Sequence, residues 1–362
     1  MKKTFVILIS ALALASCAKQ AASVTNEDSA LYLTEWIKAQ KEARPEFEWK
    51  ETALGSYILM STSTQGESAG TSDDHPFALI DCTVSNLEGS FTGTMNPEIF
   101  LWGKVDQNTD ETLARQLGTY KSNCYYGPRI VKRGQGSTTA CLEEFISSMR
   151  VGERRFAIVP GWLRSSASYS TGDEFRASVT GTHAAYNVFL RGLIDDVDKY
   201  QLDAMKDYMA KYYPSKDFAD SLQYGCYYIQ LRAPSSSRDF PADTTIYVNY
   251  TGRLLDGTVF ETTQADTAKR YGFYDSGKDY EPVQINRRTT DESITMSADA
   301  TSVITGFAKT LYQMKAYEKG VGIFYAGLGY GATGSDPSIP PYAPIAFTFE
   351  LTDKPETGSD SE

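Results

Sequence analysis

The last third of the chain carries a set of mostly aromatic and aliphatic residues whose chemistry needs no acid–base pair. The set contains neither histidine nor cysteine, and its one carboxylate has no convergent partner. Its members are Tyr250, Phe260, Glu261, Ile294, Met296, Val303, Ile304, Phe307, Tyr330, Ile339 and Phe347. Such residues can build an apolar aromatic surface, which holds a ring by contact area and shape.

Short motifs in this set resemble those of the FKBP-type peptidyl-prolyl isomerases, and from Val303 to Pro341 the spacing matches the family without a gap. The motifs are Tyr250-Thr251-Gly252, Asp256-Gly257, Phe260-Glu261, Val303-Ile304-Thr305-Gly306-Phe307, Met314, Tyr330-Gly331, Ile339-Pro340-Pro341 and Phe347. The resemblance implies an α+β fold in which an antiparallel sheet half-wraps a short helix. It also implies an isomerase that uses no cofactor and no metal.

The reaction of that family requires no nucleophile. Rotation about an X–Pro bond crosses a barrier of about 20 kcal/mol, because twisting the amide breaks its resonance. An enzyme lowers this barrier by binding the twisted amide better than either planar form. An apolar surrounding favours the twisted form, and hydrogen-bond donors aimed at the displaced carbonyl stabilise it further.

The resemblance also implies a role for each residue. The catalytic residues would be Tyr250, Phe260, Glu261, Ile304, Phe307 and Tyr330. The residues that bind substrate would be Val303, Ile339, Phe347, Ile294 and Met296. The backbone N–H of Ile304 and the hydroxyl of Tyr330 would donate hydrogen bonds to substrate carbonyls.

This sequence departs from the family pattern at several of these positions. Phe307 stands where the family usually has tryptophan at the floor of the site, and Glu261 stands where aspartate is usual. Ile294 and Met296 replace residues that are usually aromatic, which predicts a shallower cup on that side. For any one of the aromatic residues, simple core packing is the alternative reading.

The N-terminus has the features of a targeting segment. Lys2 and Lys3 precede an apolar run from Phe5 to Ala15, which has the length of a signal-peptide core and is too short to span a bilayer. The sequence Leu14-Ala15-Ser16-Cys17 resembles a bacterial lipobox. We therefore predict a signal peptide over residues 1–16 and lipidation of Cys17, the alternative being an ordinary secretory signal.

The residues after Cys17 bear on the location of such a lipoprotein. Ala18 in place of aspartate favours the outer membrane, by resemblance to enterobacterial sorting. The following residues lack the acidic run that marks surface export in some Bacteroidetes lipoproteins. The N-terminus resembles that of a bacterial, Bacteroidetes-like lipoprotein. Because the acidic run is lacking, we predict a protein of the cell envelope that is anchored by lipid and faces the periplasm.

Charge and metal-binding residues exclude other classes of function. Without Lys2 and Lys3 the chain has 33 basic and 46 acidic side chains, a balance of −13, which provides no footprint for nucleic acid. The cysteines after Cys17 are Cys82, Cys124, Cys141 and Cys226, and their wide spacing does not fit a zinc site. One disulfide among the first three, or buried free thiols throughout, are both compatible with the sequence.

The sequence contains an internal repeat, which indicates two related units. Gly55-Ser56-Tyr57-Ile58-Leu59 matches Gly225-Cys226-Tyr227-Tyr228-Ile229 at an offset of 170, and a helical segment precedes each. We predict a tether and helix over 17–50, a degenerate FKBP-like domain over 51–195 and a linker helix over 196–220. An isomerase domain over 221–353 and an acidic tail over 354–362 follow. We predict that the stretch 262–288 is a long loop, which either gates the site or is an exposed loop with no functional role.

The first unit has lost the residues that its relative retains. Thr138 and Thr139 replace the Val-Ile pair, and Leu142 replaces the aromatic floor. Hydroxyl groups do not suit an apolar pocket, so we expect this unit to serve packing or partner binding. The leading hypothesis for the whole chain is an isomerase whose partners are proline-containing exported polypeptides. The alternative is a non-catalytic chaperone or scaffold lipoprotein, and the oligomeric state is left open.

Overall fold

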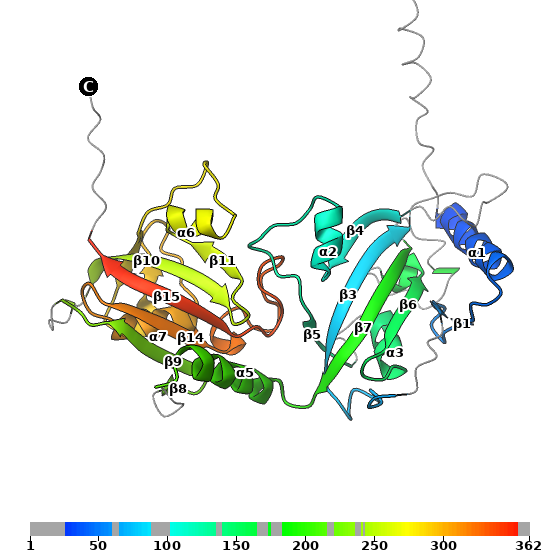
Figure 1. The fold of residues 1–362 in the computed structure, drawn as a ribbon, viewed down its shortest axis with the longest axis horizontal. Coiled ribbons are helices and arrows are strands. Elements are labelled where there is room, and N and C mark those ends of the chain that lie inside the picture. Colours follow the sequence, from blue (N-terminus) through cyan, green and yellow to red (C-terminus); the bar gives the residue numbers. More distant parts are fainter. Residues whose placement is uncertain are drawn as a thin grey trace, which may run out of the picture. The chain divides into compact units, whose positions relative to one another are not determined.

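A computed structural model describes residues 26–59, 65–87, 102–134, 140–164, 173–174, 183–215, 221–235, 240–241 and 243–353. These residues form helices and two antiparallel sheets, a mixed α+β fold (Figure 1). The predicted signal peptide, Cys17 and the acidic tail lie outside the described residues. No helix within the described ranges combines the length and the apolar character needed to cross a bilayer.

The first sheet is built from the N-terminal half of the chain. Its strands run in the order β1 (Trp49–Glu51), β2 (Tyr57–Leu59), β6 (Arg154–Val159), β7 (Ala184–Ile194), β3 (Phe77–Leu87) and β4 (Trp102–Asn108), and β5 (Arg129–Lys132) also pairs with β3. Its helical segments are α1 (Asn26–Ala43), α2 (Glu111–Gln116), α3 (Ala140–Ser147) and the short 3₁₀ turn η1 (Gly161–Leu163).

The second sheet is built from the C-terminal half. Its strands run in the order β13 (Thr295–Met296), β12 (Val283–Arg287), β10 (Thr244–Leu254), β15 (Ile345–Thr352), β14 (Lys319–Phe324), β9 (Cys226–Arg232) and β8 (Ser221–Gln223), and β11 (Val259–Thr262) pairs with β10. Its helices are α5 (Val197–Tyr212), α6 (Ala265–Arg270) and α7 (Thr305–Gln313), with 3₁₀ turns η3 (Asp291–Ser293) and η4 (Ala326–Leu328).

The two sheets share one strand order. Reading β1-β2-β6-β7-β3 in the first sheet and β8-β9-β14-β15-β10 in the second gives the same connectivity, with α3 and α7 at equivalent places in the chain. Helix α1 packs on Ile158 of β6 and Ala185 of β7. Helix α5 packs on Ile323 of β14 and Ala346 of β15. The internal repeat thus extends to the helix that precedes each sheet.

Alternation along the strands of the second sheet separates its two faces, because successive side chains of a strand point to opposite sides. Cys226, Phe324 and Phe349 belong to the cluster that contains Phe307 and Leu311 of α7. Their neighbours Tyr227 and Ile323 belong to the cluster of α5 instead. Helices α7 and α5 therefore cover opposite faces of one sheet (Figure 1).

Helix α5 lies in the segment predicted as a linker helix, and it packs on the second sheet. Met205, Tyr208 and Met209 are buried, and they pack on β9, β14 and β15. The apolar residues at helical spacing give this helix a face that must be buried, and the second sheet buries it. The helix ends at Tyr212, two residues before Pro214, whose ring and missing N–H do not allow a helix to continue.

Two further expectations differ in detail. The stretch 262–288 contains helix α6 and strand β12, which pairs with β10, so its longest part without a helix or strand is residues 271–282. The cysteines Cys82, Cys124, Cys141 and Cys226 are buried free thiols, so the disulfide alternative is not realised in this structure. Burial raises the pKa of the Cys82 and Cys226 thiols to about 12, which keeps both protonated and unreactive at neutral pH.

Candidate active site

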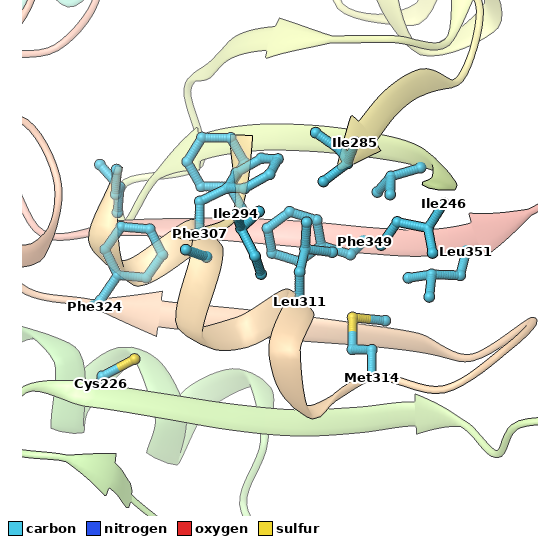
Figure 2. Packing of buried hydrophobic residues seen from close by; sticks show 14 of the residues in the cluster. Cys226, Ile246, Ile285, Ile294, Phe307, Leu311, Met314, Phe324, Phe349 and Leu351 are labelled. Carbon is cyan, nitrogen blue, oxygen red and sulfur yellow. The ribbon is translucent and has the colours of Figure 1, made fainter. Parts of the chain in front are cut away.

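The residues singled out in the sequence come together on one side of the second sheet. Phe260, Ile294, Phe307, Ile339 and Phe347 are buried members of a single hydrophobic cluster. The partly exposed residues packed against it include Tyr250, Met296, Val303, Ile304 and Tyr330. Figure 2 shows the helix side of this cluster, where Phe307 and Leu311 of α7 lie beside Phe349 of β15. Glu261 is the one predicted residue outside the cluster.

Phe347, only 2% exposed, is the aromatic centre of the group. The ring centroids of Phe307 and Phe260 lie 5.3 and 5.6 Å from its own, at interplanar angles of 80° and 77°. The Tyr250 ring lies edge-on to Phe307, with centroids 5.5 Å apart. Edge-to-face contacts of this kind hold aromatic side chains in fixed orientations. The rings therefore form a rigid group, against which Tyr250, Ile304 and Tyr330 pack.

Two glycines permit this close packing. A Cβ atom on Gly252 of β10 would lie 2.4 Å from the Phe260 ring and 2.9 Å from the Phe347 ring. A Cβ on Gly306 of α7 would lie 2.3 Å from the Phe324 ring. Any larger residue at either position would push an aromatic ring out of place. The glycines of the Tyr-Thr-Gly and Thr-Gly-Phe motifs are thus explained by close approach.

The N-terminus of α7 supplies a backbone donor. Ile304 is the N-cap residue, with φ −60° and ψ 146°, and its carbonyl accepts the hydrogen bond from the Ala308 amide. Among the described residues, the Ile304 amide N–H has no hydrogen-bond partner. Unpaired N–H groups at a helix N-terminus are suited to bind an acceptor from outside the helix. The structure therefore places this donor beside the aromatic cluster, where the sequence predicts it.

The segment that carries Tyr330 is anchored from the opposite face of the sheet. The side-chain oxygen of Gln201, on α5, accepts a hydrogen bond of 2.7 Å from the Ala326 amide. The Ala326 carbonyl then accepts hydrogen bonds from Gly329 and Gly331, on either side of Tyr330. Further on, paired hydrogen bonds between Ser335 and Ile339 close the loop that turns Ile339 into the cluster.

Glu261 acts electrostatically on the two tyrosines. Burial, and then the charge and hydrogen bond of the Glu261 carboxylate, raise the pKa of Tyr250 well above its usual range. Burial and the Glu261 charge likewise raise the pKa of Tyr330. Both shifts favour the neutral hydroxyl, because a nearby negative charge opposes phenolate formation. Both hydroxyls therefore remain protonated, and able to donate, at neutral pH.

Sequence reasoning missed two residues that bear on this site, Lys278 and Gln201. Lys278 lies in the stretch after α6, and its ammonium is 3.8 Å from the Glu261 carboxylate. Gln201 lies on α5, and its role depends on burial against η4. Neither residue belongs to a local motif, so only the tertiary structure reveals them.

A separate cavity of about 270 Å³ lies elsewhere on the second sheet. It is lined by Phe240, Thr245, Ile246, Tyr247, Ala316, Tyr317, Leu351, Thr352 and Asp353. None of the residues predicted to act on substrate borders it. The aromatic cluster, rather than this cavity, carries the groups with the chemistry described above.

The match to a known protein family falls on the same part of the chain. Residues 237–352 match the family profile of the FKBP-type peptidyl-prolyl cis-trans isomerases. The chain is 32% identical over 123 residues to FK506-binding protein 1A of Aspergillus fumigatus, a match that covers 34% of this chain and 88% of that protein. This chain belongs to the FKBP-type isomerase family.

Two further comparisons cover a smaller share of the other protein. The chain is 31% identical over 123 residues to the macrophage infectivity potentiator of Trypanosoma cruzi, and it spans only half the length of that protein. The crystal structure of FkpA from Escherichia coli shares 25% identity and is covered over 62% of its length, with a TM-score of 0.29.

Proposed function

We propose that residues 221–353 form a peptidyl-prolyl cis-trans isomerase domain. The observation that carries the proposal is the convergence of Tyr250, Ile304 and Tyr330 on one aromatic cluster in a chain of the FKBP-type family. The proline ring would rest against the aromatic rings, and the apolar surroundings would favour the twisted amide over the planar one. No proton transfer is needed, which agrees with the absence of an acid–base pair from the predicted set.

Each donor would act on a different part of the peptide. The Ile304 N–H and the Tyr330 hydroxyl would donate to peptide carbonyls that flank the proline. Burial and the Glu261 charge favour the neutral Tyr250 hydroxyl, and the Tyr250 ring, which lies edge-on to Phe307, would act as a wall. Fixed donors of this kind lower a barrier because they need no reorganisation as the amide twists.

A proline-containing tetrapeptide assay tests this function on the full chain without its signal peptide. We expect the unmodified protein to accelerate isomerisation, and the Phe307→Leu and Tyr330→Phe variants to accelerate it less. Aggregation of an unfolded client protein provides the comparison for a holding function. If the unmodified protein protected the client but left the isomerisation rate at background, the chain would be a binding module and the enzyme proposal would be wrong.

The first sheet, in this proposal, belongs to a degenerate FKBP-like domain. Its strand order and its preceding helix match those of the second sheet. Leu142 of α3 occupies the place of Phe307, so the aromatic floor is missing. Phe307→Leu should therefore lower the activity of the whole chain by the same factor as that of the second domain, because the first sheet supplies no second isomerase site.

The same proposal places the protein at the bacterial cell envelope, where it would assist the folding of exported proteins. The support is the lipobox-like sequence ending at Cys17. Two or more acyl chains would make a stable membrane anchor, whereas one gives only marginal binding. Detergent phase partition of the expressed full-length chain tests this point. The unmodified protein should enter the detergent phase and a Cys17→Ser variant should not; equal partition of the two would exclude lipidation at Cys17.

A further inference from the structure

The middle of the 262–288 stretch forms a defined turn beside the candidate site. The rings of Tyr274 and Tyr280 stack with centroids 5.2 Å apart and an interplanar angle of 18°. The Asp275 amide donates to the Tyr280 hydroxyl at 3.1 Å, and the Asp275 carboxylate accepts from the Gly277 amide at 2.9 Å. These contacts fix the backbone on both sides of Lys278.

The turn directs Lys278 toward Glu261. The Lys278 amide donates to the Asp275 carbonyl at 3.2 Å, and the ammonium lies 3.8 Å from the Glu261 carboxylate. The ammonium is also 5.7 Å from the centre of the Tyr280 ring. Glu261 follows Phe260 in β11 and pairs with Gly252 of β10, which lies against the Phe260 and Phe347 rings. Lys278 therefore brings a positive charge to the edge of the aromatic cluster.

A charge at this edge would affect which residues are accepted beside the proline of a substrate peptide. A peptide whose proline ring rests on the aromatic cluster would extend past the edge of the cluster, and Glu261 and Lys278 stand at one such edge. Glu261 alone would repel an acidic neighbour of the proline. Lys278 offsets that charge, and because its side chain is 45% exposed, its ammonium is accessible to a substrate carboxylate.

We propose that Lys278 is a specificity-determining residue that favours peptides with aspartate or glutamate next to the proline. This inference rests on the proposed isomerase function and deepens it. The contribution is modest, because the partners are exposed: ion pairs of this type are worth up to about 1 kcal/mol, which corresponds to a change in rate of up to about fivefold. The tyrosine stack acts indirectly, by holding the turn.

The test compares peptides that differ only in charge. Matched tetrapeptides carry Glu or Gln before the proline, and a second pair carries Glu or Gln after it. The quantity measured is the ratio of kcat/KM for the Glu peptide to that for the Gln peptide. In at least one pair, Lys278→Gln should lower this ratio about two- to fivefold, and Lys278→Glu should lower it further. Raising the salt concentration should reduce the difference between variants, since salt screens exposed charges.

Lys319→Gln provides the matched control. Lys319 is also a partly exposed lysine paired with a carboxylate, Glu350, at 3.1 Å, but it lies at the start of β14. This control should leave the ratio unchanged, whereas Tyr280→Ala should reproduce part of the Lys278→Gln effect because it releases the turn. An unchanged ratio in both Lys278 variants would overturn the inference while leaving the isomerase intact. A lack of turnover of every peptide by the unmodified protein would overturn the proposed function and this inference with it.

Discussion

The side-chain oxygen of Gln201 accepts a hydrogen bond of 2.7 Å from the backbone amide of Ala326. Gln201 is 1% exposed and lies on α5, on the face of the sheet opposite α7. Ala326 begins η4, and its carbonyl accepts hydrogen bonds from the Gly329 and Gly331 amides, on either side of Tyr330. A helix that the sequence predicts as a linker therefore positions a residue of the candidate active site.

Replacing Gln201 with leucine should weaken both the fold and the site. The change leaves the Ala326 amide buried without an acceptor, which costs about 1–3 kcal/mol. We expect a lower free energy of unfolding and a fall in kcat/KM beyond that of Lys206→Leu, an exposed change on the same helix. Urea unfolding and the peptide assay measure the two effects. If Gln201→Leu matched its control in activity, the anchoring role would be refuted.

Replacing Phe307 separates the aromatic floor from simple burial. Phe307→Leu keeps an apolar side chain but removes the edge-to-face contacts with Phe347 and Phe349. Aromatic pairs contribute about 0.5–1.5 kcal/mol each beyond their buried area. We expect kcat/KM to fall about tenfold, and Phe307→Trp to retain activity because it preserves an aromatic floor. Equal activity in the leucine and tryptophan variants would show that the floor needs only apolar volume.

Replacing Tyr330 with phenylalanine tests its hydroxyl as a donor. Within the described part of the chain this hydroxyl makes no hydrogen bond, so its removal should leave the unfolding free energy unchanged. A hydrogen bond to substrate is worth about 0.5–1.5 kcal/mol, which predicts a two- to tenfold fall in kcat/KM. The comparison of peptide turnover with urea unfolding checks this. A loss of stability without a loss of turnover would assign the hydroxyl to the fold instead.

The raised pKa of Tyr250 predicts how the free energy of unfolding depends on pH. In the unfolded chain a tyrosine ionises near pH 10, whereas burial and Glu261 hold the pKa of Tyr250 higher in the folded protein. Above pH 10 the unfolded chain therefore binds fewer protons, and the unfolding free energy falls as pH rises. Tyr250→Phe should make this alkaline decline less steep. Urea unfolding at several pH values between 8 and 11 measures the slope, and identical slopes would contradict the assignment.

The sequence contained most of the candidate site because its residues lie in short motifs with fixed spacing. Phe260, Ile304 and Tyr330 could be placed together by resemblance, and the structure packs all three on one cluster. Gln201 and Lys278 could not be found in this way. Gln201 reads as an ordinary polar residue of a helix until η4 buries it. Lys278 gains its place only through a turn held by the Tyr274–Tyr280 stack.

The fold was predictable to a similar depth. The repeat at Tyr57 and Tyr227 indicates two related units, and both residues lie in equivalent strands, β2 and β9. Helix α6 escaped prediction because six residues are too few for a clear helical period. The sheet pairing of β12 with β10 depends on contacts between strands far apart in sequence, which local patterns do not encode.

The most direct test of the central claim is the cis–trans exchange rate of an X–Pro peptide, measured by exchange NMR without an added protease. The full chain without its signal peptide should accelerate exchange at catalytic concentrations. The variant that combines Phe307→Leu with Tyr330→Phe, checked to be folded by circular dichroism, should return exchange to the uncatalysed rate. Equal exchange rates with and without the unmodified protein would contradict the assignment of this aromatic cluster as an isomerase site.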